Sequence, residues 1–366
     1  MKKHLRLALF YVSVAAASRA APFMAVGDGA EIFLTGTVGV RGDDNIFLEK
    51  KATKDTIFDV TAGAELTFGK DAQLKGSVGG SVAFATYADN SNLNTTLASA
   101  DFNTSYDDGK LKLGFNAGYH ELNQNAPDIR GLTRRDVFST GGTGEVEISQ
   151  ITSAGAGVSF SHENYKRVTY GDSDTLTVPV DFYYKWTPKV ELSFGYRFRD
   201  YQTTIGLDST DHFFNIGARG EFTPKLTGKI HVGLNTRKLQ RGGDQTQPGL
   251  DASFNYEITP KTSLQVGASN DYGTSPQGQQ QKNFSLNGTV TMKFTDDWSA
   301  NGGLSYRATN YGSRTDDYWE ATLGGAYIVN ANIRVVGGYT YRNYVSVLKG
   351  SEFENNVLSV AANLRY

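Results

Sequence analysis

The arginines in the second half of the chain are the residues whose spacing most suggests a chemical role. Three of them lie twelve residues after the first residue of a short polar turn: Arg199 after Thr187, Arg307 after Thr295, and Arg342 after Asn330. In extended segments, an equal interval places the three guanidinium groups at one height and on one face of a sheet. The same parity is shared by further arginines, which we include in a predicted basic ring: Arg197, Arg219 and Arg334.

Such a ring would screen solutes by charge, or guide an anionic glycan through a water-filled passage. The same face also carries carboxylates, among them Asp181, Glu191 and Glu320. Mixed signs are what a self-paired wall needs. The alternative is therefore a network in which these groups satisfy one another and stiffen the wall.

The other reactive side chains lack the spacing of a catalytic or metal site. The chain has no cysteine and five scattered histidines. The local pair of interest, Asp211 beside His212, is not enough for a catalytic triad, and no histidines stand at metal-ligand spacing. We predict no catalytic, cofactor-binding or metal site, and no enzyme. The formal net charge of −2 gives no reason to expect a nucleic-acid partner.

Composition and periodicity indicate that strands position these residues. Glycine, tyrosine and phenylalanine are abundant, at 41, 20 and 21 residues, and proline is scarce, at 8. From about residue 30 to the end, apolar and polar residues alternate in runs of about ten, as in residues 58–68 and 284–294. This is the period and length of strands that cross a membrane at a tilt. No segment is apolar enough for a membrane helix.

Short and long connections alternate along the chain, which favours a barrel with tight periplasmic turns and longer extracellular loops. The tight turns fall at 69–71, 107–109, 150–152, 187–189, 223–225, 259–261, 295–297 and 330–332, and long polar stretches cover 121–139, 164–174, 240–248 and 274–281. With a first and a last run, the eight turns predict 18 strands. The alternative is 16, if the weak runs near Leu97 and Val146 are not strands.

Four of the turns form an internal repeat, because Thr187, Thr223, Thr259 and Thr295 stand 36 residues apart. A bulky residue precedes each threonine at the border of the outward stripe, where aromatic rings sit among lipid headgroups. We predict an interfacial girdle that includes Trp186, Phe222, Phe294 and Tyr366. A hairpin turn of a soluble repeat protein is the alternative.

The apolar stripes carry almost no charge, whereas the opposite stripes are too polar for the dry centre of a sandwich. In lipid, every backbone donor and acceptor must be paired within the protein, and a closed barrel is the sheet that achieves this. We predict an all-β, transmembrane, antiparallel up-and-down barrel in the bacterial outer membrane. Its outer solvent would be membrane lipid, and its last strand, ending in Tyr366, would be recognised by the barrel-insertion machinery.

The first residues indicate a secretory leader, with Lys2, Lys3 and Arg6 followed by a short apolar run that is too short to span a bilayer as a helix. Cleavage is expected near Ala20, or as late as Ala25. Residues 1–20 are thus predicted to be a signal peptide, and residues 21–366 a single barrel.

The strand-end motif 196–201, its relatives 306–307 and 339–344, the Thr-Pro-Lys turns and the closing stretch 339–366 resemble the β-barrel porins that accompany exopolysaccharide synthesis and export systems. The resemblance covers most of the mature chain and rests on short motifs. It implies an outer-membrane location and a role in moving polysaccharide, with polysaccharide or export components as partners, and it provides no catalytic site to transfer.

Three functions follow as expectations. The first is a porin-like channel for passive passage of small hydrophilic solutes, because the strand count is large and the inward stripes are hydrophilic. The second is a barrel for export or anchoring of an exopolysaccharide, suggested by the resemblance and the arginine ring. The third is a barrel without transport that acts as a scaffold or adhesin through its loops.

Overall fold

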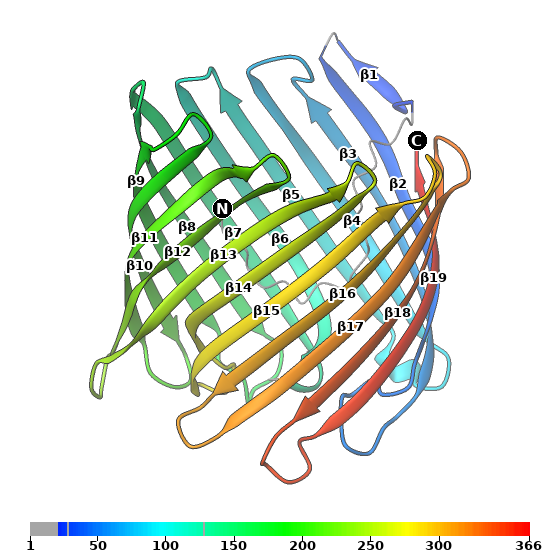
Figure 1. Cartoon of the computed structure of the whole chain (residues 1–366). Coiled ribbons are helices and arrows are strands. Elements are labelled where there is room, and N and C mark those ends of the chain that lie inside the picture. The colour runs from blue at the N-terminus through cyan, green and yellow to red at the C-terminus, as the bar shows by residue number, and fades with distance from the viewer. Residues whose placement is uncertain (1–20, 28, 127–128) are drawn as a thin grey trace.

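The chain forms one antiparallel sheet that closes on itself (Figure 1). The computed structural model describes residues 21–27, 29–126 and 129–366. Within them, each strand from β2 to β18 pairs with the next, and β19 pairs with β2 to close the ring. This confirms 18 strands rather than 16, because the weak runs near Leu97 and Val146 are β5 and β7.

The strand bounds are β1 Met24–Val26, β2 Ala30–Asp43, β3 Asp55–Phe68, β4 Leu74–Tyr87, β5 Thr95–Asp107, β6 Leu111–Ala126, β7 Ile129–Ser149, β8 Thr152–Tyr165, β9 Ser173–Lys185, β10 Val190–Thr203, β11 Ser209–Thr223, β12 Leu226–Leu239, β13 Gln245–Thr259, β14 Thr262–Thr274, β15 Gln280–Lys293, β16 Trp298–Asn310, β17 Thr315–Ile328, β18 Ile333–Val345 and β19 Phe353–Arg365. A short 3₁₀ helix, η1, covers Ser91–Leu93.

All eight predicted tight turns lie between strands at one end of the barrel, which we call the turn end. The threonines of the 36-residue repeat fold the turns directly: the Thr187 hydroxyl accepts hydrogen bonds from the amides of Lys189 and Val190, and Thr223 and Thr295 do the same in their turns. The repeated threonine therefore stabilises each turn by hydrogen bonds from its side chain to the backbone, in addition to the proline that follows it in the Thr-Pro-Lys turns. In Figure 1 the turn end is at the top and the opposite, loop end at the bottom.

The stretch 121–139, expected to be a loop, is instead a hairpin, and on this point the prediction was wrong. Strands β6 and β7 continue past the others and pair as far as Ala126 and Ile129. The error has a physical cause. Where a strand extends beyond the membrane, both of its faces meet water and carry polar residues, so the alternation of apolar and polar residues that marks a strand is lost. The consecutive polar residues Asn123, Gln124 and Asn125 of β6 illustrate this.

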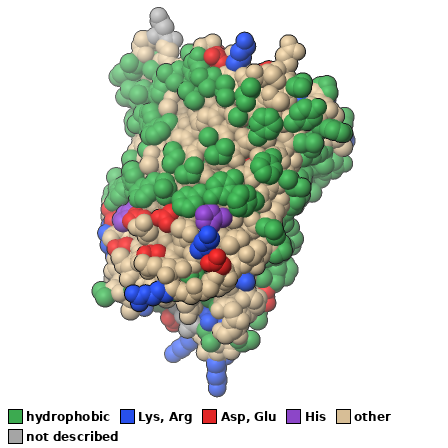
Figure 2. Space-filling model, turned by 90° about the vertical axis from the view of Figure 1, so that its left-hand side faces the viewer, with side chains coloured by type: hydrophobic (Ala, Val, Ile, Leu, Met, Phe, Trp, Pro, Cys, Tyr) green, Lys and Arg blue, Asp and Glu red, His purple; other side chains and the backbone are tan. Residues whose placement is uncertain are grey.

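The outer surface is apolar where the strands cross the membrane. Large apolar side chains such as Val38, Phe194 and Leu323 are more than 60% exposed. Figure 2 shows such side chains forming a belt, with charged side chains gathered toward the loop end. A closed sheet with an apolar exterior satisfies its backbone in lipid, so the chain is an outer-membrane β-barrel. Within the described part of the chain, no helix has the length and apolarity needed to cross a membrane.

The barrel seam includes a short strand that the sequence did not reveal. Strand β19 pairs with β2 down to Leu34, whose amide and carbonyl bond Tyr366. Beyond that point, toward the turn end, β1 pairs with β2, with Met24 opposite Ile32 and Val26 opposite Ala30. The edge that β19 leaves open on β2 is thus covered. The predicted signal peptide, residues 1–20, lies outside the described residues.

Candidate functional site

The inner wall is polar and carries the arginines that the sequence singled out. Arg197 and Arg199 lie in the loop-end half of β10, Arg307 and Arg342 in the loop-end halves of β16 and β18, and Arg219 and Arg334 near the turn end, on β11 and β18. The strands therefore place the six on two levels. Whether they act on solutes as a basic ring remains a prediction.

Arg199 belongs to an ion-paired network at the loop end. Its Nε donates to Asp211 Oδ2 at 2.7 Å, and Asp211 also accepts from Nε and Nη2 of Arg237 at 2.7 and 2.8 Å. The side chains of Asp211 and Arg237 are 1% and 2% exposed. The two guanidinium groups donate to both oxygens of this buried carboxylate. These charge-assisted bonds fix the positions of all three side chains.

The network also holds Asp271 of β14, four strands away from β10. Asp271 accepts hydrogen bonds from Arg197 at 2.8 Å, from Arg199 at 3.1 Å and from Asn235 of β12 at 2.6 Å. We define the loop-end network by its residues, Arg197, Arg199, Asp211, Asn235, Arg237 and Asp271. Because side chains of this length cannot follow the wall across three strands, β14 must bend toward the lumen.

The backbone pairing shows where this bend begins. Strands β13 and β14 pair as far as Leu250 and Asn270, whereas β14 and β15 stay paired to Thr274 and Gln280. Residues 271–281, which we call the inward hairpin, therefore leave the wall as a unit. Arg237 binds this hairpin as well, donating to the carbonyl of Gly273 and to Gln280 Oε1, both at 2.7 Å.

The tip of the inward hairpin contacts two other loops, the β8–β9 loop and the β10–β11 loop. The Gly171 amide, in the β8–β9 loop, donates to the Pro276 carbonyl at 2.8 Å. Gly278 packs against Gly206 of the β10–β11 loop so closely that a Cβ on Gly206 would lie 2.6 Å from the Gly278 Cα. Gly206 also has φ of 105°, which side chains rarely adopt. Glycine is required here by both space and backbone conformation.

A second segment, the first loop (residues 44–54), also lies inside the barrel at the loop end. Its Leu48 packs with Tyr318, Tyr344 and Phe353 of β17 to β19. On the other side, the Ile46 carbonyl accepts from Asn125 Nδ2 of β6 at 2.6 Å. The first loop therefore extends from β17 to β6 along the inner surface.

The base of the first loop is fixed by buried amides and carboxylates. Asn355, which is fully buried, donates from Nδ2 to Asp43 at 2.7 Å, and its Oδ1 accepts from Arg342 at 3.1 Å. Arg342 also donates to Glu320 at 3.0 Å. The guanidinium of Arg307 lies 5.7 Å from the ring centre of Tyr318. At the loop end, three members of the predicted ring, Arg197, Arg199 and Arg342, thus have ion-pair partners, as the self-paired alternative expects.

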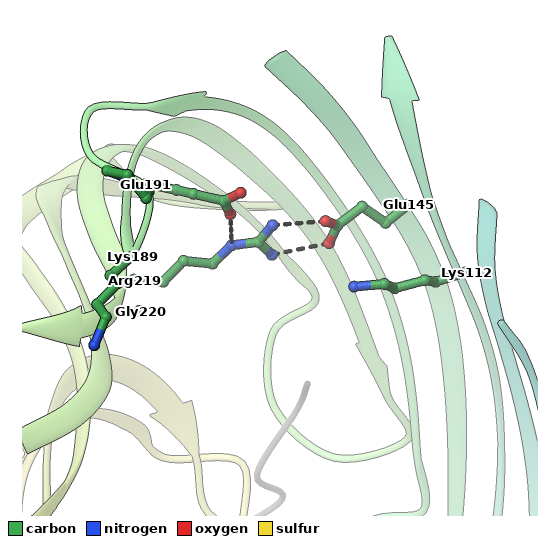
Figure 3. A pocket seen from close by; sticks show the side chains of 7 residues that line it. Lys112, Glu145, Lys189, Glu191, Arg219 and Gly220 are labelled. Atoms are coloured by element: carbon green, nitrogen blue, oxygen red, sulfur yellow. Dashed lines mark hydrogen bonds and ion pairs between the residues drawn. The ribbon is translucent and has the colours of Figure 1, made fainter. Parts of the chain in front are cut away.

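At the turn end, Arg219 of β11 reaches Glu145 of β7 (Figure 3). Its Nη1 and Nη2 donate to the two carboxylate oxygens of Glu145 at 2.8 and 2.6 Å, and its Nε donates to Glu191 of β10 at 2.7 Å. The three residues, which we call the turn-end bridge, border a cavity of about 320 Å³ together with Lys112 and Lys189.

The aromatic residues predicted as a girdle lie at the turn end of the barrel. Trp186, Phe294 and Tyr366 are more than half exposed, and Phe222, half-buried, packs against Phe254 with ring centres 5.7 Å apart. Their contact with headgroups remains a prediction.

The Asp211–His212 pair is not a site, because neighbouring residues in a strand point to opposite faces. Asp211 faces the lumen network, whereas His212 Nδ1 bonds the hydroxyl of Tyr196 at 2.8 Å on the outside. Across the part of the chain that the structure describes, no three histidine, aspartate or glutamate side chains gather as a metal site would require.

Sequence reasoning missed two carboxylates that matter, Asp271 and Glu145, and it named Asp211 only as a neighbour of His212. All three have the inward parity of the arginines, and this signal was available. The partners of Asp271 on β10 and of Glu145 on β11 are four strands away, so period and parity could not pair them. Asp211, by contrast, lies directly opposite Arg199 and Arg237 on the two adjacent strands.

Comparison with known proteins supports the architecture. Residues 199–366 match the family model "Putative beta-barrel porin 2". No curated protein matches the sequence. Similar solved structures include a BenF-like porin from Pseudomonas fluorescens Pf-5, with 10% identity, 92% of this chain and 99% of that chain covered, and a TM-score of 0.51.

Two more porin-fold structures have TM-scores of 0.50, each covering 93% of this chain and 99% of its own. They are OccAB4 of Acinetobacter baumannii, at 12% identity, and OpdK of Pseudomonas aeruginosa crystallised with vanillate, at 11%. At such low identity the likeness concerns the fold. The 18-stranded barrel of this chain shares its fold with these structures.

Proposed function

We propose that this barrel is a porin-like channel for passive passage of small hydrophilic solutes. The observation that carries the proposal is the exposure of charged side chains on the inner wall. Asp101, Lys229 and Asp251 face inward and have side chains 43%, 30% and 48% exposed. Charges in such positions need water, so the middle of the lumen is an aqueous path.

Two segments narrow this path at the loop end, the first loop and the inward hairpin. Both are anchored by buried side chains: Arg237 binds the inward hairpin, and Asn355 binds the base of the first loop. A fixed narrowing sets an upper size for solutes and leaves the rest of the lumen open. This arrangement fits passage of small solutes better than passage of a folded chain or a thick polymer.

The charge pattern supports weak selectivity. Cations and carboxylates alternate along the wall, and many are already paired, as in the contact of Arg365 with Glu65 at 3.1 Å. The fields of a paired cation and carboxylate largely cancel, so a passing ion experiences only a weak net field. We expect the ratio of cation to anion permeability to lie close to one.

Conductance of the purified protein in planar lipid bilayers tests the proposal. Steady ohmic steps of reproducible size are expected. Silence that is relieved only by an acidic glycan would favour the alternative of exopolysaccharide export or anchoring. Silence under all conditions, with unchanged solute permeability of a deletion strain, would favour a scaffold or adhesin and would refute the channel.

A further inference from the structure

The turn-end bridge crosses the interior of the barrel rather than following its wall. Strands β8, β9 and β10 separate Glu145 on β7 from Arg219 on β11, yet the two side chains form a bidentate pair. Figure 3 shows the Arg219 guanidinium extending from one group of strands toward Glu145 on the other. Any solute that uses this sector must pass the bridge.

The wall beneath the bridge is shaped to hold Arg219. The guanidinium carbon lies 3.4 Å from the ring centre of Tyr183 on β9. The ring has room because its neighbour on β8 is Gly155, where a Cβ would lie 3.3 Å from Tyr183 Cε2. With Glu191 on its Nε, Arg219 has two supports that do not involve Glu145.

Glu145 has a second cation within reach. Lys112 of β6 is the residue directly opposite Glu145 in the strand register. Opposite charges in that position normally pair, but both Glu145 oxygens are taken by Arg219, and Lys112 forms no ion pair with any described residue. The Lys112 ammonium instead points into the cavity beside the bridge (Figure 3).

We propose that the Arg219–Glu145 ion pair narrows the passage at the turn end, and that the passage widens when Glu145 releases Arg219 and pairs with Lys112 instead. We call these two arrangements the narrow and the wide position. The inference rests on the proposed channel function. In the wide position Glu145 is still paired, and Arg219 keeps Glu191 and the Tyr183 ring.

Arg219, Glu145 and Glu191 each have an opposite charge in both positions, and Lys112 gains one in the wide position. The exchange therefore leaves no charge newly unpaired, which removes the usual obstacle to breaking an ion pair inside a protein. The side chains of Arg219 and Glu145 are 27% and 26% exposed, so water assists the exchange. Glu145 can pair with either of two cations. Together, the residues Arg219, Glu145 and Lys112 therefore determine the size of solute that passes.

Single-channel conductance of three variants tests the exchange. Arg219→Gln removes the bridge and should raise the conductance about twofold, because the passage loses a side chain that spans one sector. Glu145→Gln should act in the same direction. Lys112→Gln removes the second partner, so the narrow position should dominate and the conductance should fall below that of the unaltered chain.

Lys189→Gln is the matched control. Lys189 lines the same cavity, but its partner is Glu221 at the turn end of β11, and no contact of Lys189 with a described residue crosses the lumen. Its conductance should equal that of the unaltered protein. Folding of each variant is checked by heat-dependent mobility on gels.

A covalent measurement makes the test independent of side-chain loss. The chain has no cysteine, so Glu145→Cys with Arg219→Cys can be joined by a bifunctional thiol reagent. The double variant should conduct more than the unaltered chain, and cross-linking should reverse the gain. Equal currents before and after cross-linking, and in Arg219→Gln, overturn this inference while the channel stands. Silence of every variant overturns the channel itself, and silence relieved by Arg219→Gln supports both.

Discussion

Asp271→Asn tests whether ion pairs keep the inward hairpin away from the wall. Asp271 accepts from Arg197, Arg199 and Asn235, and its side chain is 26% exposed. Asparagine has a similar shape but loses the negative charge and one acceptor oxygen. Two guanidinium groups would then face each other without this counter-charge.

The magnitude follows from the bonds lost. A hydrogen bond to a charged group contributes about 1.5–3 kcal/mol, and removing one partner of a buried pair costs about 3–5 kcal/mol. Partial exposure and the remaining contacts of Arg199 with Asp211 reduce this, so we expect about 2–3 kcal/mol. Such a change shifts the equilibrium between attached and detached hairpin roughly 100-fold.

Two measurements report the shift. Amide hydrogen exchange of residues 271–281 should accelerate by a similar factor, and single-channel current should become larger and noisier. Asp251→Asn is the matched control, because Asp251 also faces the lumen but, among the described residues, forms an ion pair with Lys229 alone, at 4.0 Å. Unchanged exchange in a folded Asp271→Asn barrel would show that the hairpin does not depend on these pairs, and the argument from the loop-end network would fail.

Three further predictions concern other parts of the barrel. Gly206→Ala should loosen the hairpin tip and raise exchange there, because its Cβ would clash with Gly278; Gly288→Ala, whose nearest contact is 4.0 Å, should have no such effect. Asn355→Ala should free the base of the first loop, so trypsin should cut at residues 50–54 faster than in the unaltered protein, and an equal rate would contradict the assigned anchor. The mature protein should begin at Ala21, because cleavage after Ala25 would divide β1; an N-terminal sequence starting at Val26 would refute this.

The repeated turns explain why the sequence alone reached the strand count. Each tight turn carries its own hydrogen-bonding residues, such as the threonine hydroxyls, and each strand carries its own alternation. These signals are local, since they act between residues close in the chain. Even β5 and β7, the weakest runs, were recovered because eight turns required strands on both sides.

The inner face was predictable in composition but not in its contacts. Parity placed Arg199, Arg219 and Arg342 inward, and mixed signs favoured a self-paired wall. Parity could not show that Arg219 finds Glu145 across three strands. It also could not show that Asp271 leaves the wall, because a bend depends on packing of distant loops such as the Gly206–Gly278 contact.

The sequence by itself determined that this protein is a lipid-facing, all-β cylinder with a polar interior, because period two, turn chemistry and the separation of apolar from charged stripes are properties of neighbouring residues. The tertiary structure decided where the interior is narrow. Closing the ring brings together strands that are far apart in the chain, and only then do the inward hairpin, the first loop and the turn-end bridge meet their partners.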